Sequence, residues 1–293
     1  MSDQLNAASG FLAGHARLLD RRRFELFFEG GDADPVLAVL RGYRNADGGF
    51  GHGLEPDLRA SESQPAAAWH AFEVFADVAP VVAPEAAELC DWLDTIALPD
   101  GGLPFALPIA DASGSAPFWA QADPQAFSLQ ITTIVAAYAN RVAAHDSAVA
   151  GHRWLARATD CCLAAIDALE AAPEAYVLAF AVRFLDAVHD RHEAAPELLA
   201  RLGEYVPEDG RLRVVGGLPN EALWPLDLAP EPGRPARTLL DEAVLAADLE
   251  RFAAEQEEDG GWTVDFQSYS PAAELEWRGY ATVRALSVVR RNG

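Results

Sequence analysis

The sequence predicts an all-α fold in which helices alternate with glycine-rich loops. Apolar residues recur at helical spacing along most of the 293-residue chain, and no useful stretch alternates as a half-buried strand would. A short acidic-glycine signature recurs at Asp47, Asp100, Asp209 and Asp259, in steps of 53, 109 and 50 residues. The middle step is about twice the others. A period near 50 residues indicates an array of similar units, each a helix, a loop and a second helix.

The recurring loops have a structural explanation. Glycine can adopt the positive φ of a left-handed helix cap, and the preceding Asp can accept hydrogen bonds from backbone amides of the turn. Phe50 and Trp262 follow the glycines in two of the loops and can pack on a neighbouring unit. The signature therefore indicates architecture rather than chemistry.

The helices follow from the apolar runs and from the Gly and Pro residues that interrupt them. The first covers residues from about 4 to 28, and Arg21-Arg22-Arg23 breaks its apolar face. We interpret this run as a solvated face or as ion-pair donors, with phosphate binding as the alternative. Nine further helices are expected at about 33–44, 64–79, 84–97, 124–143, 150–171, 173–192, 194–206, 238–257 and 272–291. Alanine-rich faces suit the four helices between 124 and 206 to close packing in an inner ring.

Three long loops separate these helices, at 45–62, 98–123 and 207–237. Loops of this length are uncommon in compact domains unless they serve a function. They fall at equivalent points of the repeat. In the toroid that the family resemblance below implies, such points lie on one rim, so we expect the loops to converge over one mouth of its central cavity.

The last glycine-rich loop carries a resemblance to a known family. Gln256, Gly260 and Trp262 fit the Gln-x-x-x-Gly-x-Trp core of the QW repeat of squalene–hopene cyclases. In the first repeat Phe50 replaces the tryptophan, and Arg44 stands where the glutamine would be.

The chain also resembles a widespread bacterial family described only as prenyltransferase-like or terpene-cyclase-like. The similar segments are 47–57, 224–232 and 270–279, and the resemblance spans nearly the whole chain. It implies a single domain over residues 1–293, an α/α toroid of about five to six helix pairs around a central cavity.

Composition narrows the class of partner. The chain has 22 Lys and Arg against 45 Asp and Glu, a net charge of −23. Such a surface repels nucleic acid and anionic membranes. No apolar run reaches the roughly 18 residues of a membrane span, and no targeting segment is evident. Cys90, Cys161 and Cys162 lack metal-type spacing and indicate reduced thiols in a cytoplasmic protein. The oligomeric state is open.

Class II terpene cyclases protonate their substrate with an Asp-x-Asp-Asp motif, which this chain lacks. Counting back from Trp69, Glu62-Ser63 falls near the last two positions of that motif. Matching Pro56-Asp57 instead puts Arg59 where the catalytic Asp belongs, and both alignments stay open. The acidic run Asp91 to Asp94 is expected on the surface of an outer helix.

The candidate catalytic carboxylates are Glu55, Asp57, Glu62 and Glu276. Ring closure would bring the first and last repeats together, so that Glu55 and Asp57 face Glu276 in one cavity. Paired carboxylates serve acid–base chemistry, including glycoside hydrolysis, or simply pair with arginines. The candidate substrate-binding residues are His52, Arg59, Trp69, Trp119, Trp224, Asp227, Tyr269, Glu274, Trp277 and Arg278. His70 can join the carboxylates, and Trp262 is a further candidate for a cavity wall.

Other chemistries lack their motifs. There is no Asp-x-Cys for the zinc site of protein prenyltransferases, no Asp-Asp-x-x-Asp for magnesium and no phosphate-binding Gly-rich loop, so we predict no metal and no cofactor. The resemblance implies a terpene-cyclase-like enzyme that acts on a small isoprenoid or other apolar substrate by acid catalysis. The alternatives are a carbohydrate-active α/α barrel with paired carboxylates, and a non-catalytic binding or interaction protein.

Overall fold

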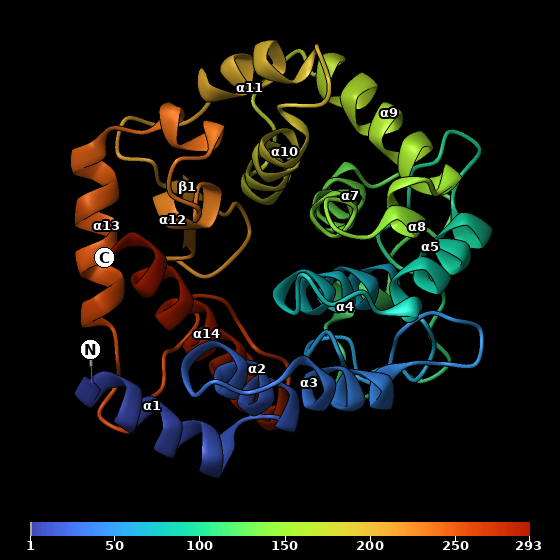
Figure 1. The fold of residues 1–293 in the computed structure, drawn as a ribbon. Helices are drawn as coiled ribbons and strands as arrows, with labels where there is room; N and C mark the ends of the chain where they lie inside the picture. Colours follow the sequence, from blue (N-terminus) through green and yellow to red (C-terminus); the bar gives the residue numbers. More distant parts are fainter. Residues whose placement is uncertain (1) are drawn as a thin grey trace.

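The computed structural model describes residues 2–293 and is mostly helical, as the periodicity predicts. Figure 1 shows the helices arranged in a ring. Five lie along its outer edge: α1 (Ser2–His15), α5 (Pro84–Ile96), α9 (Arg153–Asp167), α11 (Ala195–Gly203) and α13 (Glu242–Ala254). Five lie nearer its centre: α4 (Pro65–Asp77), α7 (Leu129–Val142), α10 (Ala175–Val188), α12 (Pro225–Leu228) and α14 (Pro271–Asn292). The ring is completed by α2 (Leu18–Phe28) and α3 (Ala33–Leu40).

Shorter elements lie in the connections. These are the helices α6 (Pro117–Ala120) and α8 (Ser147–Ala150), and the 3-10 helices η1 (Arg41–Tyr43) and η2 (Pro235–Leu239). The sequence pattern did not predict the two short strands, β1 (Leu212–Arg213) and β2 (Ala222–Leu223), which pair antiparallel within the third long loop.

The last helix closes the ring against the first ones. Helix α14 packs against α1, α2 and α13, so the two ends of the chain belong to one stretch of the ring (Figure 1). A cluster of buried apolar side chains, which includes Phe11, Phe24, Trp262 and Leu286, joins these four helices. A larger cluster fills the rest of the ring.

Most predicted helices are present, but two expectations were wrong. The first helix is interrupted, because Arg17 adopts an extended backbone and its guanidinium bonds both Asp20 and the carbonyl oxygen of Leu54. Of the four alanine-rich helices, only α7 and α10 lie near the centre, whereas α9 and α11 lie on the outer edge (Figure 1). Small side chains permit close packing on either side of a helix layer, so they do not indicate which layer a helix occupies.

The four glycine-rich loops share one turn. In each, the Asp side chain accepts a hydrogen bond from the backbone amide two residues on, at 2.9–3.0 Å. The glycine after each Asp has a positive φ, between 67° and 96°. In the last loop, the Gln256 amide donates to the carbonyl oxygens of Gln4 and Gly260, and the Trp262 indole donates to that of Phe252. The turn geometry predicted for these loops is confirmed.

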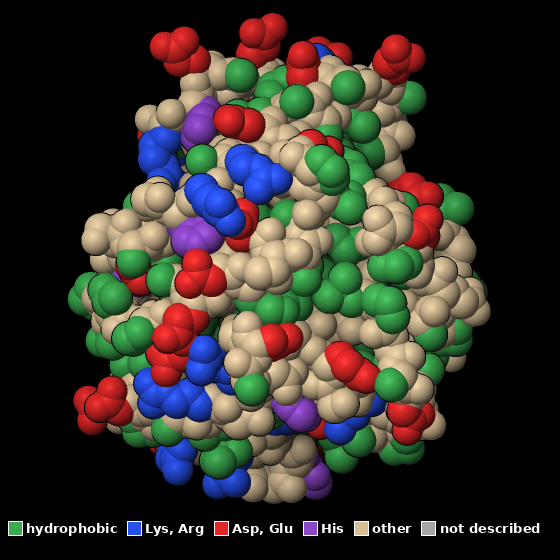
Figure 2. All heavy atoms as spheres, turned by 90° about the vertical axis from the view of Figure 1, so that its right-hand side faces the viewer, with side chains coloured by type: hydrophobic (Ala, Val, Ile, Leu, Met, Phe, Trp, Pro, Cys, Tyr) green, Lys and Arg blue, Asp and Glu red, His purple; other side chains and the backbone are tan. Residues whose placement is uncertain are grey.

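On one face of the molecule the acidic side chains are dispersed (Figure 2). On the face seen in Figure 2, acidic side chains are spread widely, with smaller groups of arginines beside them. The Asp94 carboxylate pairs with Arg153 and Arg157, so it serves as an ion-pair partner on the outside of the ring. No helix within residues 2–293 is long and apolar enough to cross a membrane. Cys90 and Cys162 are buried, and no disulfide joins the three cysteines.

Candidate functional site

The long loops meet above the amino-terminal ends of the central helices. The Gln64 side-chain amide, just before α4, exchanges two hydrogen bonds with the backbone of Leu107 in the second long loop. The Trp224 indole, just before α12, donates to Asp265 in the loop before α14 at 3.0 Å. The long loops therefore contact one another in pairs, while their convergence over one mouth of a cavity stays a prediction.

Asp57 is the centre of this convergence. Its carboxylate accepts hydrogen bonds from the Trp277 indole at 2.7 Å and from the Tyr269 amide at 3.0 Å. Its carbonyl oxygen accepts from the amide of Ala116 at 2.8 Å. Burial raises the pKa of Asp57, and the two donors to its carboxylate partly offset this effect. The side chain therefore ties the first long loop to the last helix and to the second long loop.

Beside Asp57 lies a buried network of two carboxylates, a histidine and a tyrosine. His70 Nε2 lies 2.8 Å from Glu55 Oε2, and His70 Nδ1 lies 2.9 Å from Glu73 Oε2. The Tyr280 hydroxyl donates to the other oxygen of Glu73 at 2.8 Å. His70 and Glu73 are three residues apart on α4, so they share one face of the helix.

The network fixes the protonation of His70. Burial alone would lower its pKa, but the hydrogen bonds and charges of Glu55 and Glu73 outweigh burial and raise the pKa of His70 to about 9. Burial would likewise raise the pKa of Glu73, yet the His70 bond and the charges of His70 and Arg23 lower it to about 2. An imidazolium between two carboxylates therefore exists at neutral pH. Both of its N–H groups are used, so it can hold the loop in place but cannot accept a proton.

Glu276 and Arg59 form an ion pair next to this network. Burial raises the pKa of Glu276, and the charges of Arg17 and Arg59 oppose that shift. The charges of Glu55 and Glu276 both act on the pKa of Asp57. Glu55, Asp57 and Glu276 are therefore brought together at the ring closure, and each is engaged by a fixed partner. None of the three lines either of the two cavities found between the central helices, so the structure does not place them in the single cavity that we expected.

Four other predicted residues lie apart from this group. His52 is exposed and bonds Asn45, while Glu62 accepts from the amide of Ala110 at the surface. Glu274 is exposed on the first turn of α14. Arg278 makes two hydrogen bonds to Asp259 in the last glycine-rich loop. These four side chains therefore lie apart from Glu55, Asp57 and Glu276, because they point toward solvent or toward other loops.

The predicted aromatic residues divide into packing and lining roles. Trp69 stacks on His70 at 4.5 Å between ring centroids, and Trp119 stacks on Phe105 at 4.6 Å. Tyr269 packs edge-on against Phe118.

Trp224, Asp227, Trp262 and Trp277 line a cavity of about 140 Å³, here called the Trp224 cavity. Its remaining polar and aromatic lining residues are Tyr176, Glu221, Arg251, Phe252, Glu255, Thr263, Asp265, Phe266, Tyr280 and Arg284.

The Trp224 cavity combines aromatic rings with charge. The guanidinium carbons of Arg211 and Arg251 lie 4.0 and 3.9 Å from the Trp224 ring centroid. Asp227 accepts from the Trp224 amide at 2.7 Å and from Arg284 at 2.5 Å, which fixes both groups.

Glu221 lies on the same cavity wall. Its carboxylate accepts hydrogen bonds from the Tyr176 hydroxyl at 3.2 Å and from the amide of Leu218 at 2.9 Å. Sequence reasoning missed Tyr176, Glu221 and Arg284, since each comes from a different repeat and carries no motif.

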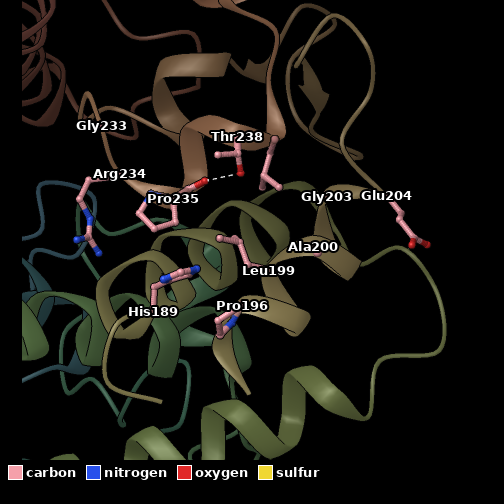
Figure 3. Close-up of a pocket in the computed structure, with 11 residues that line it drawn as sticks. His189, Pro196, Leu199, Ala200, Gly203, Glu204, Gly233, Arg234, Pro235 and Thr238 are labelled. Atoms are coloured by element: carbon pink, nitrogen blue, oxygen red, sulfur yellow. Dashed lines mark hydrogen bonds between the residues drawn. The ribbon is translucent and has the colours of Figure 1, made fainter. Parts of the chain in front are cut away.

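A larger hollow lies elsewhere, on the outer rim. It has a volume of about 690 Å³ and lies between α11 and η2 (Figure 3). Arg234 on its wall bonds Asp186, His189 bonds Asp190, and Glu204 lies apart from the other side chains. The hollow is therefore large enough for a ligand, but few of its polar side chains are free to bind one. We do not regard it as the functional site.

Among known proteins, no family model and no curated protein matches this chain. Within residues 2–293, no group of three or more His, Cys, Asp or Glu side chains is arranged to hold a metal ion.

Proposed function

We propose that the chain is an α/α toroid of six helix pairs that binds a small hydroxylated molecule of the carbohydrate class in the Trp224 cavity. The pairs are α1–α2, α3–α4, α5–α7, α9–α10, α11–α12 and α13–α14. The glycine-rich loops that join repeated helices support this architecture, as does the resemblance of the last loop to a QW repeat.

The observation that carries the proposal is the mixture of groups in the Trp224 cavity. Four carboxylates and two arginines line it among seven aromatic rings. A sugar offers hydroxyl groups to charged side chains and apolar faces to aromatic rings. A hydrocarbon would remove water from Glu221 and Asp265, which have no ion-pair partner, without replacing their hydrogen bonds to water, at a cost of several kcal/mol. The volume is also below the roughly 300 Å³ of pockets that hold drug-sized ligands.

Glu221 and Asp265 are the carboxylates that we assign to acid–base chemistry on this ligand. Asp227 and Glu255 are held in ion pairs by Arg284 and Arg251. Glu221 and Asp265 have no arginine within ion-pair distance among residues 2–293. Glycoside hydrolysis needs two carboxylates of which one can hold a proton.

Acid catalysis on an isoprenoid, which the resemblance implies, is supported less well. It needs a carboxylic acid at the wall of an apolar cavity. Asp57 accepts a hydrogen bond from the Trp277 indole. It lines neither the Trp224 cavity nor the neighbouring cavity that Tyr138, Arg183 and Ser287 line. On that hypothesis Asp57→Asn would lower turnover by about 100-fold or more, whereas our proposal leaves the chemistry to Glu221 and Asp265.

The proposal is tested by calorimetric titration with a panel of mono- and disaccharides, together with hydrolysis of aryl glycosides. We expect binding of at least one sugar, and we expect Glu221→Gln and Asp265→Asn each to lower hydrolysis by roughly 100-fold while binding persists. Glu258→Gln is the matched control, because Glu258 is exposed in the same loop as Asp265 and lies outside the cavity.

Two results would overturn the proposal. One is the absence of binding by every sugar in the panel. The other is binding of an apolar isoprenoid whose affinity is unchanged in Arg251→Met and Glu221→Gln. Such a ligand would bind without using the charged groups of the cavity. Binding without hydrolysis would retain the ligand class and remove the catalytic roles of Glu221 and Asp265.

A further inference from the structure

A second central cavity lies on the other side of Tyr280 and Arg284, which line both cavities. It has a volume of about 270 Å³. We call it the arginine cavity, because Arg23, Arg141, Arg183, Arg284 and Arg291 all line it. Its walls come from the carboxyl-terminal halves of α2, α4, α7, α10 and α14, whereas the Trp224 cavity lies toward the amino-terminal ends of α10 and α14.

The charge of this cavity is opposite to that of the protein. Five arginines face three carboxylates, Glu73, Asp77 and Glu231, so the lining has an excess of two positive charges. The whole chain carries −23, and only 22 cationic side chains are available to it. Five of these 22 side chains, nearly a quarter, line this one cavity. An even distribution of arginines over the surface would not produce such a group.

The carboxylates do not neutralise all of these arginines. Asp77 pairs with Arg23 at 2.7 Å, and Glu231 pairs with Arg291 and, at 3.6 Å, with Arg141. Glu73 is engaged by His70 and Tyr280.

Arg183 has no such partner. Within residues 2–293 no carboxylate oxygen lies within 4 Å of its guanidinium, which instead donates to the Tyr138 hydroxyl. An anion that enters the cavity can therefore pair with Arg183 without displacing a carboxylate.

The carboxyl ends of helices explain only part of this arrangement. The helix dipole attracts cations in the last turn, where Arg141 and Arg291 stand. Arg183 lies five residues before the end of α10, and Arg284 lies eight before the end of α14. The dipole effect falls off within one turn, so it does not account for either of these side chains.

Two side chains that line the arginine cavity also carry a hydrogen-bonding group without a partner among the described residues. The Nε of Arg183 is buried and has no hydrogen-bond partner among residues 2–293. The same holds for the hydroxyl of Ser287, whose side chain is 4% exposed. Buried polar groups are normally satisfied, so two unsatisfied donors on side chains that line one cavity point to a bound group that completes them. Both are donors suited to an anionic oxygen.

We propose that the arginine cavity is a binding site for a small oxyanion, a phosphate, sulfate or carboxylate group, held by Arg183 and Ser287. Guanidinium groups match such anions with two parallel hydrogen bonds. The cavity has room for the anion and a short organic part. The site is independent of the proposed sugar, because neither Arg183 nor Ser287 lines the Trp224 cavity.

The test is calorimetric titration of the full chain with inorganic phosphate, sulfate and citrate at constant ionic strength, with sodium chloride as the reference salt. We expect at least one of the three to bind. Arg183→Met should weaken that binding by roughly 10- to 100-fold, the loss expected for a hydrogen bond to a charged group. Ser287→Ala should weaken it less, because a neutral donor contributes less.

The controls separate a specific site from general attraction. Arg153→Met removes one positive charge from an exposed side chain on the outer edge, so it should leave anion binding unchanged. Arg183→Lys keeps the charge, removes the fork and should bind with intermediate affinity. Equal weakening in Arg153→Met and Arg183→Met would overturn the proposal, as would no binding of any of the three anions by the wild-type protein.

Discussion

At the scale of single residues, one contact of the His70 network can be recognised from the sequence and two cannot. Glu73 follows at helical spacing, so that pair can be recognised in advance. Glu55 approaches from a loop, and Tyr280 approaches from the last helix, 207 residues after Glu73. The Glu55 contact depends on how the first long loop folds back onto α4, and the Tyr280 contact depends on ring closure. The sequence alone therefore presents neither of them.

The His70 network predicts a specific pH dependence of stability. The pKa of His70 rises from 6.5 in the unfolded chain to about 9 in the folded protein. The stabilisation is therefore fully present below about pH 6.5 and is lost as the pH rises toward 9. The loss should be on the order of 3 kcal/mol in the free energy of urea unfolding. His70→Gln should remove most of this dependence, and an equally steep decline in that variant would contradict our assignment.

At the scale of elements, the sequence predicts the helices well and their ends less well. Periodicity locates the central helices α4 and α10 to within a few residues. The break between α1 and α2 depends on Arg17, whose bond to the carbonyl of Leu54 is a tertiary contact that no local pattern contains. The glycine-rich loops were predictable because their turn is made within four residues.

Gly260 provides a test of the loop geometry. Its φ is +92°, and a Cβ there would lie 2.2 Å from the carbonyl oxygen of Ala7 in α1. Gly260→Ala should therefore lower the free energy of unfolding by roughly 1–3 kcal/mol from backbone strain, and by more if α1 must shift. Chemical denaturation measures this change.

Gly10→Ala is the matched control for Gly260→Ala. Gly10 lies within α1, and a Cβ there would meet nothing within 4 Å. This variant should stabilise the protein by about 0.4–1 kcal/mol, because alanine loses less conformational freedom on folding. If Gly260→Ala matched the control, the close approach of the loop to α1 would be refuted.

At the scale of the whole molecule, ring closure determines which parts of the site were predictable. The closed toroid that the resemblance implies was the reason to expect the first and last repeats to meet, and Arg59 does pair with Glu276 across 217 residues. The same argument cannot identify cavity walls. The two central cavities take single side chains from several helices, and Arg183 or Glu221 looks like any surface charge until the ring is assembled.

The bond between Asp57 and the Trp277 indole joins residues 220 apart, so it measures the closure directly. A double-mutant cycle of Asp57→Ala and Trp277→Phe should give a coupling free energy of about 1.5–3 kcal/mol, as for a buried hydrogen bond to a charged group. Phenylalanine at position 277 keeps an aromatic ring next to Phe266, whose centroid is 5.0 Å away, and removes only the indole N–H and part of the ring. The free energies of unfolding of the four proteins come from urea denaturation.

A second cycle shows whether that coupling is specific to the closure. Trp154 is fully buried on α9, and its indole N–H has no partner among residues 2–293. Asp57→Ala and Trp154→Phe should therefore be additive within about 0.3–0.5 kcal/mol, as expected for distant sites. Additivity in both cycles would mean that the Asp57 bond contributes nothing to closure. Coupling in the Trp277 cycle alone would show that one buried carboxylate, placed by a loop of the first repeat, holds the last helix in the ring.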